Sequence, residues 1–149
     1  LLADEFAVID PKTGAIKPCL KAVSLKARAI DIMRERLPSD VMSEEYSTER
    51  GRIALLRPSE ASARAVAEPA RLRWVISPEF TPGRALNLKR VPRSQAFMTM
   101  ASNAFNYSVL GYNGFRTLGS ALMAANGYEL SHGDLDDAVA AVERMAADG

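Results

Sequence analysis

Residues 71–76, Arg-Leu-Arg-Trp-Val-Ile, carry the clearest strand pattern in the sequence. Side chains alternate between the two faces of a β-strand, so the leucine, tryptophan and isoleucine fall on one face and the arginines on the other. We expect the apolar face to meet the core. Arg71 and Arg73 then form either a solvated strand face or a pair of guanidinium groups that binds phosphate oxygens.

On the N-terminal side of this strand, the sequence predicts short strands, two helices and a polar loop. Residues 10–14, Asp-Pro-Lys-Thr-Gly, follow an apolar run and predict the turn of a hairpin. The other expected elements are a strand at 22–25, a helix from Lys26 that Pro38 ends, an exposed mobile loop at 39–50, a strand at 52–56 and one or two helical turns at 59–66 capped by Ser59.

On the C-terminal side, helices dominate. Pro82-Gly83 marks a turn, and the elements expected after it are a strand at 86–91, helices at 92–105 and 114–125, a left-handed cap at Asn126-Gly127, a short strand at 128–130 and a final helix capped by Asp134. The final helix is expected to bury Leu135, Val139, Val142 and Met145. This order predicts an α/β or α+β fold with a mixed sheet, and since no linker divides residues 1–149 we expect one domain.

The composition excludes several classes of protein. The chain has 149 residues, 48% of them hydrophobic, and a formal net charge of +1. So small a charge does not favour binding to nucleic acid, which needs clustered basic residues. The single cysteine, Cys19, leaves no disulfide framework, and no apolar run approaches the roughly 20 residues of a spanning helix. We therefore expect a cytoplasmic protein without a membrane segment.

The start of the sequence predicts a strand that is already under way. Leu1 is not methionine, and Leu1-Leu2-Ala3 is typical of the apolar end of a strand. We expect the chain to be a fragment or a processed product.

Asp4 and Glu5 follow this apolar end and are the first candidate site. Phosphoryl transfer needs such a pair, because one carboxylate holds Mg²⁺ while the other receives the proton of the attacking hydroxyl. The simpler interpretation is a solvated edge between strand and turn. The sequence contains no Gly-Lys-Ser or Gly-Lys-Thr phosphate-binding loop, and Gly111-Tyr112-Asn113-Gly114 has no lysine.

Other residues of chemical interest have ordinary structural explanations. His132 is the only histidine, which excludes a His-based metal cluster and favours a loop residue bonded to nearby backbone. Cys19 is interpreted as a small core or strand residue. Near the start of the first helix, Lys21, Lys26 and Arg28 form a candidate anion-binding cluster. Residues 103–107 form a helix-helix corner that holds two asparagines.

Several segments together resemble the HPr kinase-related kinase A family, a bacterial group found with exosortase and exopolysaccharide systems. They run along nearly the whole chain in a specific order: Leu2-Ala3-Asp4-Glu5-Phe6, Val23-Ser24-Leu25-Lys26, Glu68-Pro69-Ala70-Arg71, Arg73-Trp74-Val75, Asn103-Ala104-Phe105-Asn106-Tyr107 and Gly133-Asp134-Leu135-Asp136.

The resemblance implies part of a phosphoenolpyruvate carboxykinase-like fold whose phosphate-binding loop lies upstream. HPr kinases also have a strand that ends in two adjacent aspartates, and Asp4 and Glu5 match these positions. Asp4 would bind Mg²⁺ and Glu5 would assist as acid or base, with ATP and Mg²⁺ as implied cofactors. Glu5 departs from the family's aspartate by one methylene, which puts the base assignment in doubt. No arginine here matches the family's catalytic arginine.

Two functions remain open at this stage, and a nucleic-acid-binding module is a distant third, because Trp74, the obvious aromatic, is expected on the apolar face. The first is the C-terminal part of an ATP-dependent serine kinase with an unknown phosphoacceptor, inactive by itself and able to form a homo-oligomer. HPr is a poor candidate for the phosphoacceptor, since the C-terminal signature of HPr kinases is not evident. The second is a non-catalytic scaffold domain with a kinase-like shape in a polysaccharide-export or protein-sorting system.

Overall fold

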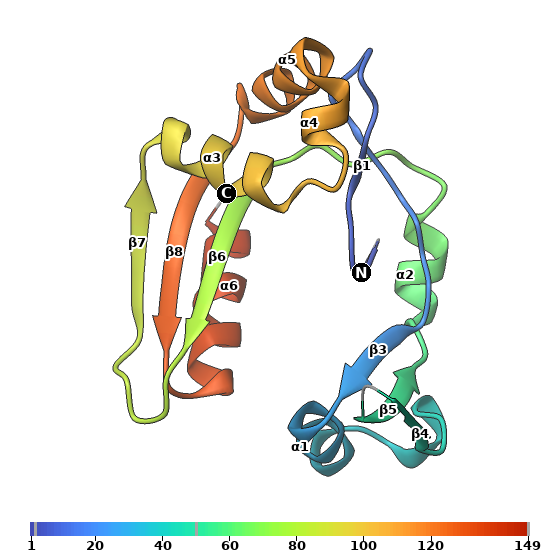
Figure 1. The fold of residues 1–149 in the computed structure, drawn as a ribbon. Coiled ribbons are helices and arrows are strands. Elements are labelled where there is room, and N and C mark those ends of the chain that lie inside the picture. The colour runs from blue at the N-terminus through green and yellow to red at the C-terminus, as the bar shows by residue number, and fades with distance from the viewer. Residues whose placement is uncertain (2, 50, 149) are drawn as a thin grey trace. The chain divides into compact units, whose positions relative to one another are not determined.

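The chain has a mixed α and β architecture. A computed structural model describes residues 1, 3–49 and 51–148 (Figure 1). Three small sheets and six α-helices lie within these described residues, which confirms the expected fold class at this level. The residues form two compact units: Leu1–Val8 with Ile16–Ala70, and Ile9–Ala15 with Arg71–Gly149. The single domain expected over residues 1–149 stays a prediction.

A hairpin near the start of the chain confirms the turn predicted at residues 10–14. Its strands are β1 (Val8–Ile9) and β2 (Ile16–Lys17), which pair in a two-stranded sheet. The Asp10 carboxylate accepts a hydrogen bond from the Lys12 amide at 2.8 Å. Gly14 adopts φ +70°, a left-handed conformation that favours glycine.

The first unit is an antiparallel sheet with helices beside it. Its sheet has the order β3-β5-β4, with Leu25 of β3 opposite Ala54 of β5. The elements are β3 (Val23–Lys26), α1 (Arg28–Arg36), the 3-10 helix η1 (Ser39–Val41), β4 (Tyr46–Thr48), β5 (Gly51–Leu56) and α2 (Glu60–Ala65).

The core of the first unit joins α1 to the sheet. Leu25, Ile30 and Ala54 form one buried cluster, and Ile30 of α1 is fully buried. This confirms the predicted strands at 22–25 and 52–56 and the helix that ends before Pro38. The Ser59 hydroxyl accepts a hydrogen bond from the Ser62 amide at 3.1 Å, so the predicted cap of α2 is also confirmed.

The mobile loop expected at residues 39–50 is wrong. This segment contains η1 and β4, and β4 pairs with β5 in a hairpin with Ser47 opposite Arg52. All three residues of β4 are exposed, so the strand lacks the apolar alternation by which a half-buried strand is recognised. Arg50 lies outside the described residues.

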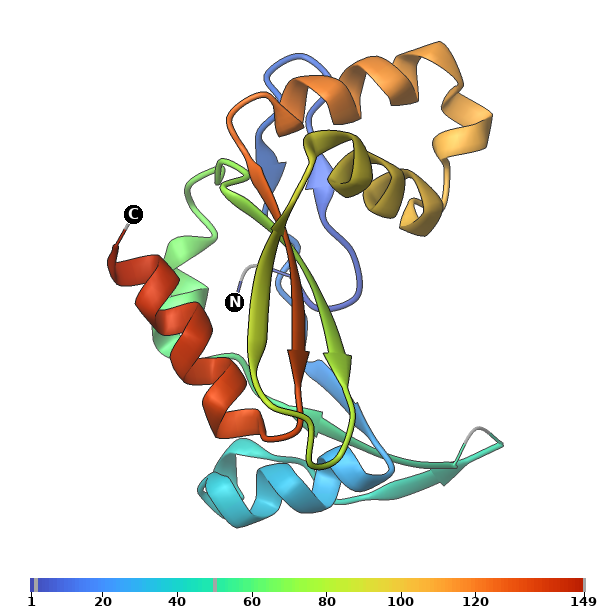
Figure 2. The same cartoon turned by 90° about the vertical axis from the view of Figure 1, so that its left-hand side faces the viewer.

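The second unit is a mixed sheet with helices. Its sheet has the order β6-β8-β7, and β8 runs parallel to β6 and antiparallel to β7. The elements are β6 (Trp74–Phe80), β7 (Asn87–Val91), α3 (Arg93–Asn103), α4 (Tyr107–Leu110), α5 (Tyr112–Leu122), β8 (Asn126–His132) and α6 (Leu135–Ala147). Helix α6 lies along one face of the sheet (Figures 1 and 2).

The strand predicted at residues 71–76 begins later and extends further. Strand β6 starts at Trp74 and continues through Pro78 to Phe80. Pro78 is tolerated because β6 is an edge strand of its sheet, where a missing N–H breaks no ladder bond. Arg71 and Arg73 therefore precede the strand, and the alternation predicted for them does not apply.

The helix cap predicted at Asn126-Gly127 is wrong. These residues begin β8, the central strand of its sheet, and the short strand predicted at 128–130 is the middle of it. A Cβ atom at Gly127 would lie 2.7 Å from Ala96 Cβ and 2.8 Å from Val91 Cγ2. The absence of a side chain at Gly127 thus allows α3 to pack closely against β8, and the glycine is not part of a turn.

The final helix is present but turned from its predicted orientation. Ala138 and Ala141 are buried, and of the predicted stripe Leu135 and Val139 are exposed while Val142 and Met145 are half-buried. Small side chains let the helix backbone approach the sheet closely, which a stripe of large residues would prevent. The predicted cap is confirmed, because an Asp134 carboxylate oxygen accepts hydrogen bonds from the next amides, one of them at 2.8 Å.

Candidate functional site

Asp4 and Glu5 lie in an exposed bend of the first unit, not at the end of a strand. Leu1 and Ala3 are outside any strand, and Leu2 lies outside the described residues. The bend is held from the side: Asp4 Oδ2 accepts a hydrogen bond of 3.1 Å from the amide of Ser24 in β3. We expected residues 1–3 to end a strand, but the segment is instead attached to β3 by this hydrogen bond from the Ser24 amide to the Asp4 side chain.

Both carboxylates line one small cavity. Its volume is about 160 Å³. The lining comes from two segments of the first unit, the bend and the approach to β3, and consists of Asp4, Glu5, Phe6, Cys19, Lys21, Ala22 and Ser24. The chain thus brings together Asp4, Glu5, Cys19 and Lys21, which the sequence presented as separate candidates.

Lys21 lines the same cavity and contacts the Phe6 ring. Its Nζ lies 5.2 Å from the centre of the Phe6 ring, a favourable cation–π geometry. The cavity therefore offers two kinds of group. The carboxylates suit a hard cation, and the ammonium suits an anionic oxygen such as that of a phosphoryl group.

The carboxylate pair fits one mode of Mg²⁺ binding. In kinase sites Mg²⁺ is bound by one or two carboxylates, with substrate phosphates and water as its other ligands. In the described part of the chain, no three His, Cys, Asp or Glu side chains are placed to hold a metal ion together. Asp4 and Glu5 therefore do not form a complete metal cage, and Mg²⁺ held here would need phosphate and water as further ligands.

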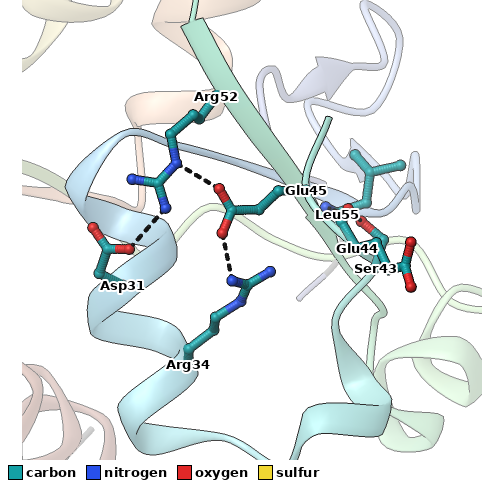
Figure 3. A network of polar contacts seen from close by, with 7 residues as sticks. All are labelled: Asp31, Arg34, Ser43, Glu44, Glu45, Arg52 and Leu55. Carbon is teal, nitrogen blue, oxygen red and sulfur yellow. Dashed lines mark hydrogen bonds and ion pairs between the residues drawn. The ribbon is translucent and has the colours of Figure 1, made fainter. Parts of the chain in front are cut away.

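A separate ionic network ties α1 to the β4–β5 hairpin. Arg34 and Arg52 converge on the Glu45 carboxylate from two sides, while Glu44 points away (Figure 3). Arg52 also pairs with Asp31 of α1 at 3.0 Å. The hydrogen bond from Arg52 is the main reason that the pKa of Glu45 is lowered, and the charge of Arg34 adds to it. All four side chains are engaged with one another, so we interpret the network as structural.

His132 is a packed residue at the end of β8. It is buried, and its Nδ1 donates to the carbonyl oxygen of Asp134 at 2.9 Å. Its ring lies 5.5 Å from that of Phe80. The predicted bond to nearby backbone is confirmed, although the residue belongs to a strand and not to a loop.

The other cationic candidates do not join the cavity. The Arg73 guanidinium stacks 4.9 Å from the Trp74 ring in the second unit. Lys26 ends β3 and Arg28 begins α1, and both are exposed. Only Lys21 of the predicted anion-binding cluster lines the cavity.

The segment at residues 103–107 forms the helix-helix corner that the sequence predicted, but it is packed only in part, since Phe105 is exposed. Asn103 Nδ2 donates to the Thr99 carbonyl at 2.8 Å, and the Tyr107 ring meets the Phe97 ring edge-on at 6.2 Å. The amide of Asn103 is thus used within its own helix.

Sequence reasoning missed one polar member of the site. Ser24 was placed on a short strand, but nothing marked its amide as the partner of Asp4. The only available signal was the hairpin turn at residues 10–14, which sends the chain back toward its start.

No family model matches the chain, and no curated protein or solved structure matches it either. None of the helices in the described residues combines the length and apolar character needed to cross a bilayer.

Proposed function

We propose that this chain is the C-terminal part of an ATP-dependent, Mg²⁺-requiring serine kinase related to HPr kinase. One observation carries the proposal: Asp4 and Glu5, the residues that match the family's acidic pair, line one cavity together with Lys21. The family resemblance supplies the rest, including a partial phosphoenolpyruvate carboxykinase-like fold. An ATP-dependent kinase of this kind would work in the cytoplasm.

The residues have distinct roles in this proposal. Asp4, oriented by the Ser24 amide, would hold Mg²⁺, which neutralises the charge on the phosphates when it is bound. Glu5 would accept the proton of the attacking hydroxyl. Lys21 carries the positive charge suited to an oxygen of the transferred group.

The cavity accounts for only part of an ATP site. Ligand pockets typically measure roughly 300–1,000 Å³, and this one has about 160 Å³. The volume suits a cation and a phosphoryl group but not a whole nucleotide. We therefore propose that the phosphate-binding loop belongs to a longer chain, and that residues 1–149 alone do not transfer phosphate.

A non-catalytic scaffold domain is the second candidate. The glutamate at the position where the family has a second aspartate favours it. The two candidates differ upstream: an intact loop in the longer chain favours the kinase, and a degraded loop favours the scaffold.

Asp4→Asn in the longer chain tests the kinase proposal. The amide removes the charge that binds Mg²⁺, so Mg²⁺-dependent phosphoryl transfer should fall by at least about a hundredfold, the order expected when one electrostatic group is lost. Thermal unfolding should change little, because Asp4 is exposed. The matched control is Asp40→Asn, an exposed carboxylate of the same unit outside the cavity. Equal activity in both variants would remove Asp4 from the mechanism.

A further inference from the structure

An apolar surface is exposed where α3, α4 and α5 meet. We call it the corner patch and define it by Phe105, Val109, Leu110, Tyr112 and Phe115. Phe105 and Val109 are each 85% exposed and Tyr112 is 72% exposed. Side chains so exposed project from the surface and are not shielded by their neighbours. Figure 2 shows this corner projecting from one end of the second unit's sheet.

The corner patch rests on a packed base. The Phe115 ring contacts the Phe97 ring at 5.3 Å, and Phe97 also meets Tyr107, which joins all three helices. Gly111, at φ 51°, supplies the tight turn between α4 and α5. The exposed side chains are therefore displayed by a defined framework.

The exposed area of the corner patch is comparable with the largest apolar patches that proteins carry, which are often functional surfaces. Its three aromatic side chains alone expose roughly 400 Å², since each has about 150–250 Å² to bury. Val109 and Leu110 add to this area. The largest apolar patch on a typical monomer is about 300–600 Å², and each partner in a standard interface buries about 800 Å². The corner patch alone can supply most of the apolar part of such an interface.

The residues around the patch have the composition of a protein interface. No Asp or Glu occurs between Glu79 and Glu129, and residues 93–122 contain no lysine. Interface cores are depleted in these residue types and enriched in Phe, Tyr, Met and Arg. Arg116 stacks 5.8 Å from the Tyr112 ring. An anionic membrane would instead select a cluster of basic side chains, which this corner does not have.

We propose that the corner patch is the contact between two copies of this chain. Its face is nearly uncharged, so it can meet an identical face in a two-fold arrangement without a complementary charge on the partner. The two Arg116 side chains are the like charges that would approach each other, and each already lies against an aromatic ring. A partner with an acidic surface would find no array of basic residues here.

Sedimentation analysis of Val109→Asp tests this proposal. The wild-type chain should form a dimer between low micromolar and near-millimolar concentration. The aspartate should raise the dimer Kd by at least about thirtyfold, as expected for a central contact residue. The matched control is Val139→Asp, an exposed valine on α6 of the same unit, which should leave the Kd unchanged. A monomeric wild-type chain, or equal effects of the two substitutions, overturns the proposal.

Cross-linking gives a second readout that does not depend on loss of structure. In a Cys19→Ser background, Val109→Cys should form an intermolecular disulfide on oxidation, because a two-fold contact places each position near its copy. Val139→Cys in the same background should form no intermolecular disulfide, although it should still dimerise. If both cysteines cross-link equally, or neither does, the contact is not at the corner patch. Binding of the wild-type monomer to phosphatidylserine vesicles without dimerisation would also overturn it.

Discussion

Gly127 is a residue on which the packing of α3 against β8 depends directly. Gly127→Ala would place a methyl group within 2.7 Å of Ala96 Cβ, in the space where α3 meets β8. Because neither neighbour is the flexible end of a long side chain, we expect a loss of about 1–3 kcal/mol in the free energy of unfolding. Chemical denaturation followed by circular dichroism measures it.

The control for this substitution is Gly119→Ala on α5. No atom lies within 4 Å of a Cβ at that position, and alanine favours a helix interior by up to about 1 kcal/mol over glycine. Gly119→Ala should therefore be neutral or stabilising. If Gly127→Ala is equally well tolerated, α3 does not pack against β8 as closely as described.

Glu45 should give the first unit a dependence on acidic pH. Its folded-state pKa lies below the ordinary value of 4.5, chiefly because of the Arg52 hydrogen bond. A lowered pKa contributes stability above the unfolded-state pKa, and this stability is lost as pH falls through the folded-state value. Glu45→Gln should therefore destabilise the first unit at pH 7 and flatten the loss of stability below about pH 4.5. Denaturation midpoints across that pH range measure both effects.

Glu44→Gln is the matched control for Glu45. The two carboxylates are adjacent in sequence, but Figure 3 shows Glu44 pointing away from the arginines. Its replacement should leave the pH profile as in the wild type. Identical profiles for both variants would mean that the network around Glu45 does not form in solution.

At the scale of elements, helix α6 depends on its N-cap residue, Asp134. Asp134→Ala removes the oxygen that accepts the amides of Asp136 and Asp137, and should cost about 0.5–2 kcal/mol. Asp134→Asn keeps a capping oxygen and should retain most of that stability. Thermal unfolding of the two variants beside the wild type checks this, and a loss as large for asparagine as for alanine would contradict the capping role.

Elements with a strong local signal were predictable from the sequence. Helix α1 combines apolar spacing with Pro38, and the first hairpin has Asp10 and Gly14 at its turn. The start of strand β8 was predicted as a helix cap because Asn126-Gly127 is typical of a helix end. The glycine is instead required by packing against Ala96, a tertiary contact that the local sequence does not show. Strand β4 was missed because its pairing with β5 leaves it exposed on both faces.

At the scale of the whole molecule, the division into two units had no signal in composition. Each unit has its own apolar cluster, one around Ile30 and the other around Leu122. The chain passes between the units at three places without a Gly- or Ser-rich linker, so nothing marked the boundaries. The last of them lies between Ala70 and Arg71.

The candidate site was predictable only in part. Asp4 and Glu5 were candidates because they form an acidic pair after an apolar run and match the family's acidic pair, but local sequence gave no reason to group them with Cys19, Lys21 or Ser24. That grouping depends on how the hairpin returns the chain to β3, which is a property of the fold. The grouping of these residues around one cavity is therefore the support for the kinase proposal that comes from the structure and not from the sequence.

Calorimetric titration of Mg²⁺-ATP into residues 1–149 and into the longer chain, side by side, tests the central claim most directly. We predict binding by the longer chain, weakened by Asp4→Asn, and none by residues 1–149 alone. Binding by residues 1–149 alone would contradict a site divided between this chain and a separate phosphate-binding loop. Binding by neither protein would contradict the kinase proposal and favour the scaffold.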